Sequence, residues 1–271
     1  MSEPAAANSN PPNGDIDLSA AGGIYRLTLN RPQRLNAFTR NMLSAMSDAL
    51  ADIAADREAR VLVITGAGRA FSAGQDLTDK GAVEDGRACR NTVERYYNPV
   101  IRQINSLDLP VIAAVNGIAA GAGVSLALAC DIVVAVESAA FDLAFARIGL
   151  IPDAGGTHHL QRLLGPARAK AMSMLGEKIA AAEAVQLGLI YRAVPDADFA
   201  AEIGALAQRL ASGPTKALAL MKQAFHAGDH NSLEQQLALE AELQSQAADT
   251  EDFAEGLAAF LGKRAPRFKG L

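Results

Sequence analysis

Short, wholly apolar runs alternate with glycine-rich turns through the first two thirds of the sequence. Residues 111–115 are rich in β-branched side chains and lie between Pro110 and the turn signal Asn116-Gly117, which is typical of a strand buried on both faces. The order of buried strand, glycine turn and helix recurs along the chain. We place its three copies at residues 61–77, 111–129 and 148–164. This recurrence predicts several strand-to-helix turns of one kind stacked on one another.

The segments before and between these strands carry their own local signals. Two strand-like runs flank residues 20–23 and predict an N-terminal hairpin. Thr39 can cap a helix whose apolar side chains recur at helical spacing, whereas the polar residues 79–91 predict a mobile loop. Pro99 must kink or split the helix that follows this loop, because proline cannot donate a backbone hydrogen bond.

The chain divides by composition into three parts. Residues 1–14 are mainly Ala, Ser, Asn and Pro without the apolar segment of a signal peptide, and they predict a disordered leader. Strand signals continue to residue 194, so residues 15–195 are predicted to form an α/β core. The pattern of residues 196–271 is only helical, which predicts a separate helical C-terminal region.

Charge and cysteine content exclude several classes of protein. The net charge of −5 and pI of about 5.4 give no positive field that would favour nucleic acid. Cys89 and Cys130 form neither a disulfide framework nor a metal-ligand spacing, so a reduced, cytoplasmic setting is the default expectation. Residues 109–136 are apolar, but Asn116 and Asp131 interrupt them, which favours a buried core over a membrane span.

Two glycine-rich turns offer backbone donors instead of catalytic side chains. Gly121 and Gly123 suggest a dinucleotide-binding turn, but Leu126 stands where that motif has its third glycine. A strand-to-helix turn leaves several N–H groups unpaired, and small residues let an oxygen approach them closely. One such turn lies near Gln75 and another near Ala122. If their N–H groups converge on one oxygen, they form an oxyanion hole for a thioester or similar carbonyl.

Asp153 is the acid beside a third glycine turn. It lies between Pro152 and Ala154-Gly155-Gly156, where its carboxylate can either face the same cavity or cap a helix. No Walker A motif, HExxH motif or nucleophile elbow accompanies it, and no His and carboxylate residues stand at metal spacing. Burial would raise the pKa of Asp153 and a nearby helix N-terminus would lower it, and the sequence does not decide between them.

Taken together, these stretches resemble the crotonase superfamily, the enoyl-CoA hydratases and isomerases, over residues 15–270. The resemblance rests on several separate motifs in the family's order, at residues 27–37, 71–77, 110–131 and 148–157. It implies an α/β fold that is a crotonase-type spiral of ββα turns with an α-helical C-terminal trimerisation region. It also implies acyl-CoA thioesters as substrates, a homotrimer or a dimer of trimers, and no cofactor beyond the coenzyme A of the substrate.

The resemblance also assigns roles to residues of this chain. The backbone N–H groups of Gln75 and Ala122 would form the oxyanion hole, and Asp153 would be the catalytic acid or base. No metal ligand is implied. The residues that would hold the CoA thioester come from two short stretches, namely Arg34, Leu35, Ala37, Ala73, Gln75, Asp76 and Leu77.

Departures from the family pattern narrow the activity. A hydratase of this family needs two glutamates, and Ser125 and Phe145 stand at the matching positions. Asp153 in the stretch Ile-Pro-Asp resembles the branch of isomerases that convert ring-1,2-epoxyphenylacetyl-CoA to oxepin-CoA in phenylacetate catabolism. One carboxylate also suffices to shift a double bond from the 3- to the 2-position of an enoyl-CoA. The sequence therefore predicts an isomerase with Asp153 as the proton shuttle.

Three alternatives stand beside this interpretation. An enoyl-CoA hydratase is disfavoured by Ser125 and Phe145. A dehalogenase of the same superfamily would need a tryptophan, which is absent, and an earlier histidine, whereas all four histidines follow Asp153. A non-catalytic acyl-CoA-binding or scaffolding subunit would keep the donor turns with an inert acid. The acyl pocket would be lined by aromatic side chains, those of Tyr96, Tyr97, Phe141 and Phe145.

Overall fold

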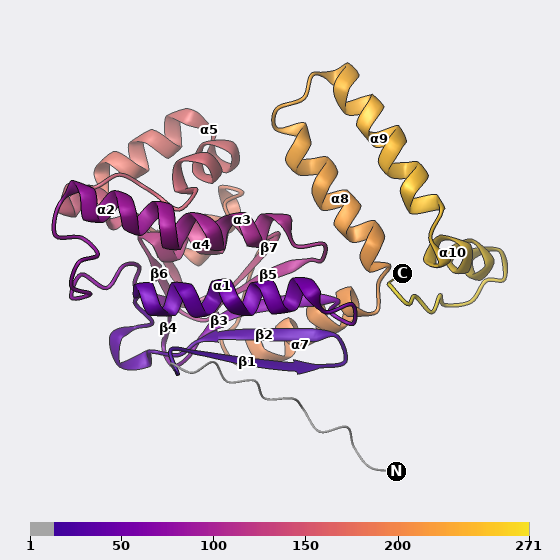
Figure 1. Cartoon of the computed structure of the whole chain (residues 1–271), viewed down its shortest axis with the longest axis horizontal. Coiled ribbons are helices and arrows are strands. Elements are labelled where there is room, and N and C mark those ends of the chain that lie inside the picture. The colour runs from indigo at the N-terminus through magenta and orange to yellow at the C-terminus, as the bar shows by residue number, and fades with distance from the viewer. Residues whose placement is uncertain (1–13, 271) are drawn as a thin grey trace, which may run out of the picture.

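Two β-sheets form the spiral, and between residues 61 and 142 successive strands alternate from one sheet to the other (Figure 1). The computed structural model describes residues 14–270, so the leader expected at residues 1–14 lies almost wholly outside the described residues. The larger sheet has the order β1-β2-β3-β5-β7-β10 and the smaller one β4-β6-β8-β9. The strands are β1 (Ile16–Ala21), β2 (Ile24–Leu29), β3 (Val61–Gly66), β4 (Ala70–Ser72), β5 (Val111–Val115), β6 (Ile118–Ala120), β7 (Ile132–Val136), β8 (Ala140–Asp142), β9 (Lys178–Ala180) and β10 (Arg192–Val194).

Helices follow the strand pairs and complete the turns of a spiral. In each of three turns a strand of the larger sheet leads to a short strand of the smaller sheet and then to helix, as in β5-β6-α4. Strands β3, β5 and β7 pair in parallel, and so do β4, β6 and β8. The helices are α1 (Arg40–Ala55), α2 (Gly86–Thr92), α3 (Asn98–Ser106), α4 (Ala122–Leu128), α5 (Gly156–Leu175), α6 (Ala181–Gln186), α7 (Phe199–Ala211), α8 (Thr215–Gly228), α9 (Leu233–Ala248) and α10 (Glu251–Leu261). This is the spiral of ββα turns that the family resemblance implies.

The strand predicted at the start of the third repeat is wrong, whereas the helix that ends this repeat forms as α5. The strands of this turn are β7 and β8, and the apolar residues 148–151 form no strand, because Ile148 ends a short 3-10 helix and residues 149–151 lie in the loop before α5. Ile151 is 76% exposed, and it lines a cavity together with Ile148 and Leu150. An apolar run at a cavity resembles a buried strand in sequence, because both exclude polar side chains.

Local signals account for the hairpin and the first helices. Thr39 caps α1 by accepting a hydrogen bond from the backbone N–H of Met42, as predicted. The mobile loop predicted over residues 79–91 is wrong in its second half, because Asp85 caps α2 through the N–H of Ala88. A π-helical turn (Val93–Tyr97) joins α2 to α3, and Pro99 is the second residue of α3, so the predicted effect of the proline is a change in the helical pattern and not a break in the helix.

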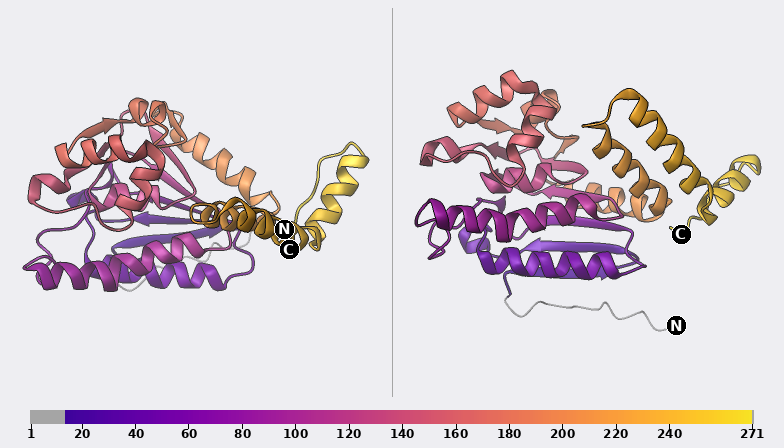
Figure 2. Two further views of the ribbon diagram at one scale, coloured as in Figure 1. Left: turned by 90° about the horizontal axis from the view of Figure 1, so that it is seen from above. Right: turned by 45° about the horizontal axis from the view of Figure 1, so that its top comes forward.

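The C-terminal helices divide into two groups. Helix α7 packs on the larger sheet, with Ile203 and Ala207 buried against Val61 and Val63. Helix α7 therefore packs with the core, although it follows the domain boundary predicted at residue 195. Helices α8, α9 and α10 extend away from the spiral as an arm (Figures 1 and 2). No helix within residues 14–270 is long and apolar enough to cross a membrane.

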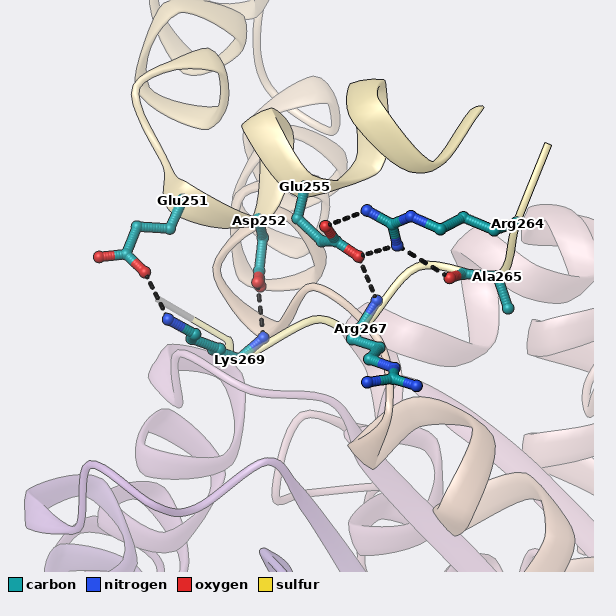
Figure 3. Close-up of a pocket in the computed structure, with 7 residues that line it drawn as sticks. All are labelled: Glu251, Asp252, Glu255, Arg264, Ala265, Arg267 and Lys269. Atoms are coloured by element: carbon teal, nitrogen blue, oxygen red, sulfur yellow. Dashed lines mark hydrogen bonds and ion pairs between the residues drawn. The ribbon is translucent and has the colours of Figure 1, made fainter. Parts of the chain in front are cut away.

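The C-terminal tail folds back along α10 and ties the arm to the core (Figure 3). Asp252 is buried and accepts hydrogen bonds from the backbone N–H groups of Lys269 (2.6 Å) and Gly270 (2.7 Å). Glu255 pairs with Arg264 (2.6 Å), and this guanidinium lowers the pKa of Glu255 to about 2. From the core, Arg60 donates to the carbonyl groups of Gly213 (2.7 Å) and Lys269. The tail thus fixes how α10 meets the spiral.

All four histidines of the chain line one groove between α5 and α8. Burial in this groove, of about 600 Å³, lowers the pKa of His159 from 6.5 to about 4. His158 lies against His159 and within 3.8 Å of Asp229, which also pairs with Arg162 (3.1 Å).

A pH-dependent loss of stability follows from His159. Between pH 6.5 and about 4 the unfolded chain binds a proton that the folded chain does not, so the free energy of unfolding falls as the pH falls through this window. The expected loss at pH 4 is about 3 kcal/mol. Urea unfolding measured at several pH values checks this, with His159→Gln as the comparison. An equal pH dependence in both proteins would contradict the assignment to His159.

Candidate active site

One cavity of about 630 Å³ collects the candidate catalytic residues. Gln75, Ala122 and Asp153 all line it, so the structure brings the three predicted residues together. Its other walls come from the region of α2 to α3 and from residues 144–151. Most of these side chains are apolar, and they include Ala82, Val83, Val93, Ile148, Leu150 and Ile151.

The turn after β4 presents the N–H of Gln75. Phe38 bridges to Gln75 as in a parallel sheet, because its N–H donates to the carbonyl of Gly74 (2.7 Å) and its carbonyl accepts from Asp76 (2.8 Å). In such a pairing the bridged residue directs its own N–H to the opposite side. Among residues 14–270 the N–H of Gln75 has no hydrogen-bond acceptor.

The first turn of α4 presents the N–H of Ala122. Gly121 precedes it with φ 51° and ψ −124°, a conformation that favours glycine. Ala122 is the first helical residue, and its N–H finds no acceptor within the described part of the chain. A Cβ atom on Gly74 would lie 3.3 Å from the Ala122 nitrogen, so the two donor turns are in contact. The geometry therefore suits two amides that share one oxygen.

Asp153 lies in the turn before α5 and lines the cavity. Its backbone carbonyl accepts from Gly156 (2.7 Å) in the turn that begins α5, and Ala154 follows it with φ 48°. Its Oδ1 atom is buried and has no hydrogen-bond partner among the described residues. Burial raises the pKa of Asp153 from 3.8 to about 6, although its own backbone N–H acts to lower it. Burial thus outweighs this hydrogen bond and sets the direction of the pKa shift, which the sequence did not decide.

The positions that match the hydratase glutamates carry no acid. Ser125 is buried in α4, with its Oγ only 2.7 Å from where a Cβ atom of Gly156 would be. Phe145 is buried and its ring covers Gly121 in the cavity wall. The one other carboxylate of the lining, Glu94, is exposed and pairs with Arg90 (2.8 Å). Sequence reasoning missed this pair, which its i,i+4 spacing would have indicated.

The aromatic wall is smaller than expected. Tyr97 and Phe145 line the cavity as predicted, but Phe141 and Tyr96 do not. Phe141 is fully buried in β8 and packs in the main core. The expectation for Phe141 is therefore wrong, because its strand directs this side chain into the core and not into the cavity.

The residues predicted to hold CoA fall into two groups. Three of them line the cavity, namely Ala73, Gln75 and Leu77. The others, Arg34, Leu35, Ala37 and Asp76, lie outside the lining. The N–H of Ala73 donates to the carbonyl of Leu35 (2.9 Å), so the two stretches lie side by side.

The carboxylate of Asp76 is already engaged within the protein. It is buried, and it pairs with Arg31 at 2.9 Å. Burial acts to raise the pKa of Asp76, but hydrogen bonds from Thr78 and Arg31 give a net lowering. This carboxylate therefore holds the loop together, and a role of Asp76 toward CoA would fall to its backbone.

The chain belongs to the enoyl-CoA hydratase/isomerase family. The family described as "Enoyl-CoA hydratase/isomerase" matches residues 19–271. The fold is that of the crotonase superfamily, as the sequence resemblance implied. An enoyl-CoA hydratase from Bacillus anthracis has the same fold with a TM-score of 0.90 and 35% identity, over 95% of this chain and 100% of that chain.

Relatives of this chain are named after two different activities. The "Probable enoyl-CoA hydratase" of Rhodobacter capsulatus is 52% identical over 94% of this chain and 98% of that protein. The "1,2-epoxyphenylacetyl-CoA isomerase" of Escherichia coli is 46% identical over 92% of this chain and 95% of that protein. The protein is therefore an enzyme of a family that acts on acyl-CoA thioesters, and hydration and isomerisation must be distinguished by the site.

Proposed function

We propose that the protein is an acyl-CoA isomerase that converts ring-1,2-epoxyphenylacetyl-CoA to oxepin-CoA, shifts 3-enoyl-CoA to 2-enoyl-CoA, or does both. The observation that carries this proposal is the carboxylate of Asp153 in the cavity that contains both amide donors, because its Oδ1 atom is buried and has no hydrogen-bond partner among residues 14–270. Ser125 and Phe145 stand where a hydratase needs its two acids. The E. coli relative with the isomerase name supports the same choice.

The proton transfer needs only one acid–base group. The thioester oxygen would accept hydrogen bonds from the N–H groups of Gln75 and Ala122, which stabilise negative charge on it. Asp153 would take a proton from C2, and the electron pair of that C–H bond would enter a dienolate. Asp153 would then return the proton to C4, which leaves the double bond at C2–C3 and restores the carboxylate. The raised pKa of Asp153 makes it a stronger base than an exposed aspartate.

The acyl group is assigned from the cavity wall. Val93, Phe145 and Ile148 present apolar surface around the donors, which suits the ring of a phenylacetyl-derived thioester. We also propose that the protein assembles as a homotrimer or a dimer of trimers. Apolar side chains on the arm support this, because Phe225 is 80% and Phe260 81% exposed in the single chain. Light scattering of the purified protein checks the assembly, and a monomeric mass would contradict it.

The pH dependence of kcat/KM follows from the pKa of Asp153. The base must be ionised, so kcat/KM for a 3-enoyl-CoA should fall about tenfold per pH unit below pH 6 and level off above it. Initial rates between about pH 5 and 8 measure this profile. A flat profile across this range would show that a different group carries the proton.

A comparison of three substrates tests the proposed reaction. Purified enzyme should convert 3-enoyl-CoA and enzymatically generated epoxyphenylacetyl-CoA, and it should leave crotonyl-CoA unchanged. Steady loss of the conjugated absorbance of crotonyl-CoA would instead favour a hydratase, the activity in the name of the R. capsulatus relative. Tight thioester binding without turnover of any substrate would favour a non-catalytic acyl-CoA-binding or scaffolding subunit.

A further inference from the structure

Tyr97 joins the two halves of the candidate site. Its hydroxyl donates a hydrogen bond to the side-chain carbonyl oxygen of Gln75 at 2.9 Å. It lines the cavity that also contains Asp153, and the charge of Asp153 contributes to a raised pKa of Tyr97 after the larger effect of burial. Tyr97 thus donates to the donor turn and lines the same cavity as the base, and the proton transfer described above does not use it.

The backbone around Tyr97 directs it to this position. The π-helical turn Val93–Tyr97 widens the helix just before Pro99, which has no N–H to continue the regular pattern. The ring of Tyr97 packs edge-on against Phe38, with centroids 5.8 Å apart. Phe38 is the same residue whose backbone holds both neighbours of Gln75. Tyr97 is only 4% exposed, so its hydroxyl has little access to water as an alternative partner.

Both polar atoms of the Gln75 side-chain amide form hydrogen bonds. Its carbonyl oxygen accepts from Tyr97, and its amide nitrogen donates to the backbone carbonyl of Asp76 at 3.1 Å. The residue before it, Gly74, has φ 84° and lacks a side chain that would restrict the peptide between them. The orientation of the Gln75 N–H therefore depends on contacts from outside this turn. Phe38 supplies the backbone pairing, and Tyr97 supplies a side-chain contact from the helical wall.

We propose that Tyr97 is a positioning residue of the oxyanion hole, which acts by anchoring the Gln75 side chain so that its backbone N–H points at the thioester oxygen. This inference rests on the proposed function, because it concerns the same oxyanion hole. The phenol stays neutral, since its raised pKa keeps its proton on oxygen at physiological pH. Its hydrogen bond is committed to Gln75, and Asp153 keeps an unpartnered oxygen for the substrate proton.

Turnover of four variants tests the anchor. Tyr97→Phe removes the hydroxyl but keeps the ring contact with Phe38, and it should lower kcat about tenfold with KM within about twofold. Gln75→Met keeps the backbone N–H and removes the acceptor, so it should lower kcat by a similar factor. The double variant should be no slower than either single one, because both remove the same hydrogen bond. Tyr96→Phe is the matched control, since Tyr96 lies outside the cavity lining, and it should keep the wild-type kcat.

The pH profile distinguishes an effect of Tyr97 on the Gln75 side chain from an effect of Tyr97 on Asp153. The acid limb of kcat/KM should stay near pH 6 in Tyr97→Phe, because burial raises the pKa of Asp153 and the substitution keeps the ring in the wall of the same cavity. A shift of this limb by one unit or more would show that Tyr97 acts through Asp153, which would overturn the proposal. Multiplicative losses in the double variant, or an unchanged kcat in Tyr97→Phe, would overturn it as well.

A spectroscopic measurement keeps the test independent of turnover. Dimethylaminocinnamoyl-CoA absorbs at longer wavelength when hydrogen bonds polarise its thioester carbonyl. Bound to wild type and to Tyr96→Phe it should show the same red shift, and bound to Tyr97→Phe or Gln75→Met a smaller one. Equal shifts in all four proteins would contradict the anchor. A red shift that is smaller in Tyr97→Phe and Gln75→Met than in wild type, without turnover of 3-enoyl-CoA or of epoxyphenylacetyl-CoA by wild type, would contradict the proposed reaction and leave the anchor supported.

Discussion

Asp153→Asn is expected to lower kcat for isomerisation of a 3-enoyl-CoA about a thousandfold while leaving Kd for the thioester within about twofold of wild type. Asparagine has the shape of aspartate, but it cannot take the proton from C2. Binding should persist because the buried Oδ1 has no partner among the described residues that the change would remove. Single-turnover kinetics and calorimetric titration with a CoA thioester measure the two quantities.

The same variant should be more stable than wild type at neutral pH. The folded state raises the pKa of Asp153 from 3.8 to about 6, so the ionised carboxylate costs stability above pH 6, up to about 3 kcal/mol. Asparagine carries no charge and avoids this cost. A rise in the urea midpoint at pH 7 would therefore show that lost activity is not lost folding. Glu94→Gln is the matched control, because Glu94 is the exposed carboxylate of the cavity rim. Undiminished turnover in Asp153→Asn would remove Asp153 from the mechanism.

Ala122→Pro is expected to lower kcat/KM about a hundredfold to a thousandfold by removing one oxyanion donor. Ala122 is the first residue of α4, where proline is tolerated because that N–H has no partner within the helix. The change therefore deletes the donor while the helix can still form. Initial rates with a 3-enoyl-CoA measure the loss, and circular dichroism checks that the fold is retained.

A proline placed at the start of a distant helix controls for effects of proline that do not arise from the loss of the oxyanion donor. Leu233 is the first residue of α9 and is exposed, so Leu233→Pro makes the same change far from the cavity lining. Its kcat/KM should equal that of wild type. If Ala122→Pro retains its fold and turns over as fast as Leu233→Pro, the Ala122 N–H does not hold the thioester oxygen.

The sequence predicted best those helix starts that are set by a capping residue or a proline within a few positions. Thr39 marks the start of α1, and Pro99 the start of α3, because capping and proline act over a few residues. The strands of the smaller sheet have only three residues, as in β6 (Ile118–Ala120), and are too short for a periodic pattern. The split of the C-terminal helices between core and arm depends on contacts of α7 with the sheet, which no local signal contains.

The identity of the site residues could be predicted from the sequence, but their burial and their hydrogen bonds could not. Resemblance to the family named Gln75, Ala122 and Asp153, and the structure places all three around one cavity. The direction of the Asp153 pKa shift depends on burial by residues distant in sequence, so the sequence left it open. The hydrogen bond from Tyr97 to Gln75 depends on how a π-helical turn faces a loop, which residue spacing does not encode.

The product formed from a 3-enoyl-CoA tests the central claim most directly, namely that one buried carboxylate and two amides isomerise the substrate without adding water. Absorbance and mass spectrometry of the reaction follow conjugation and mass together. The account predicts that the absorbance of the conjugated 2-enoyl thioester rises and persists, with a product of unchanged mass. A product heavier by one water, or no conjugated product at all, would contradict it.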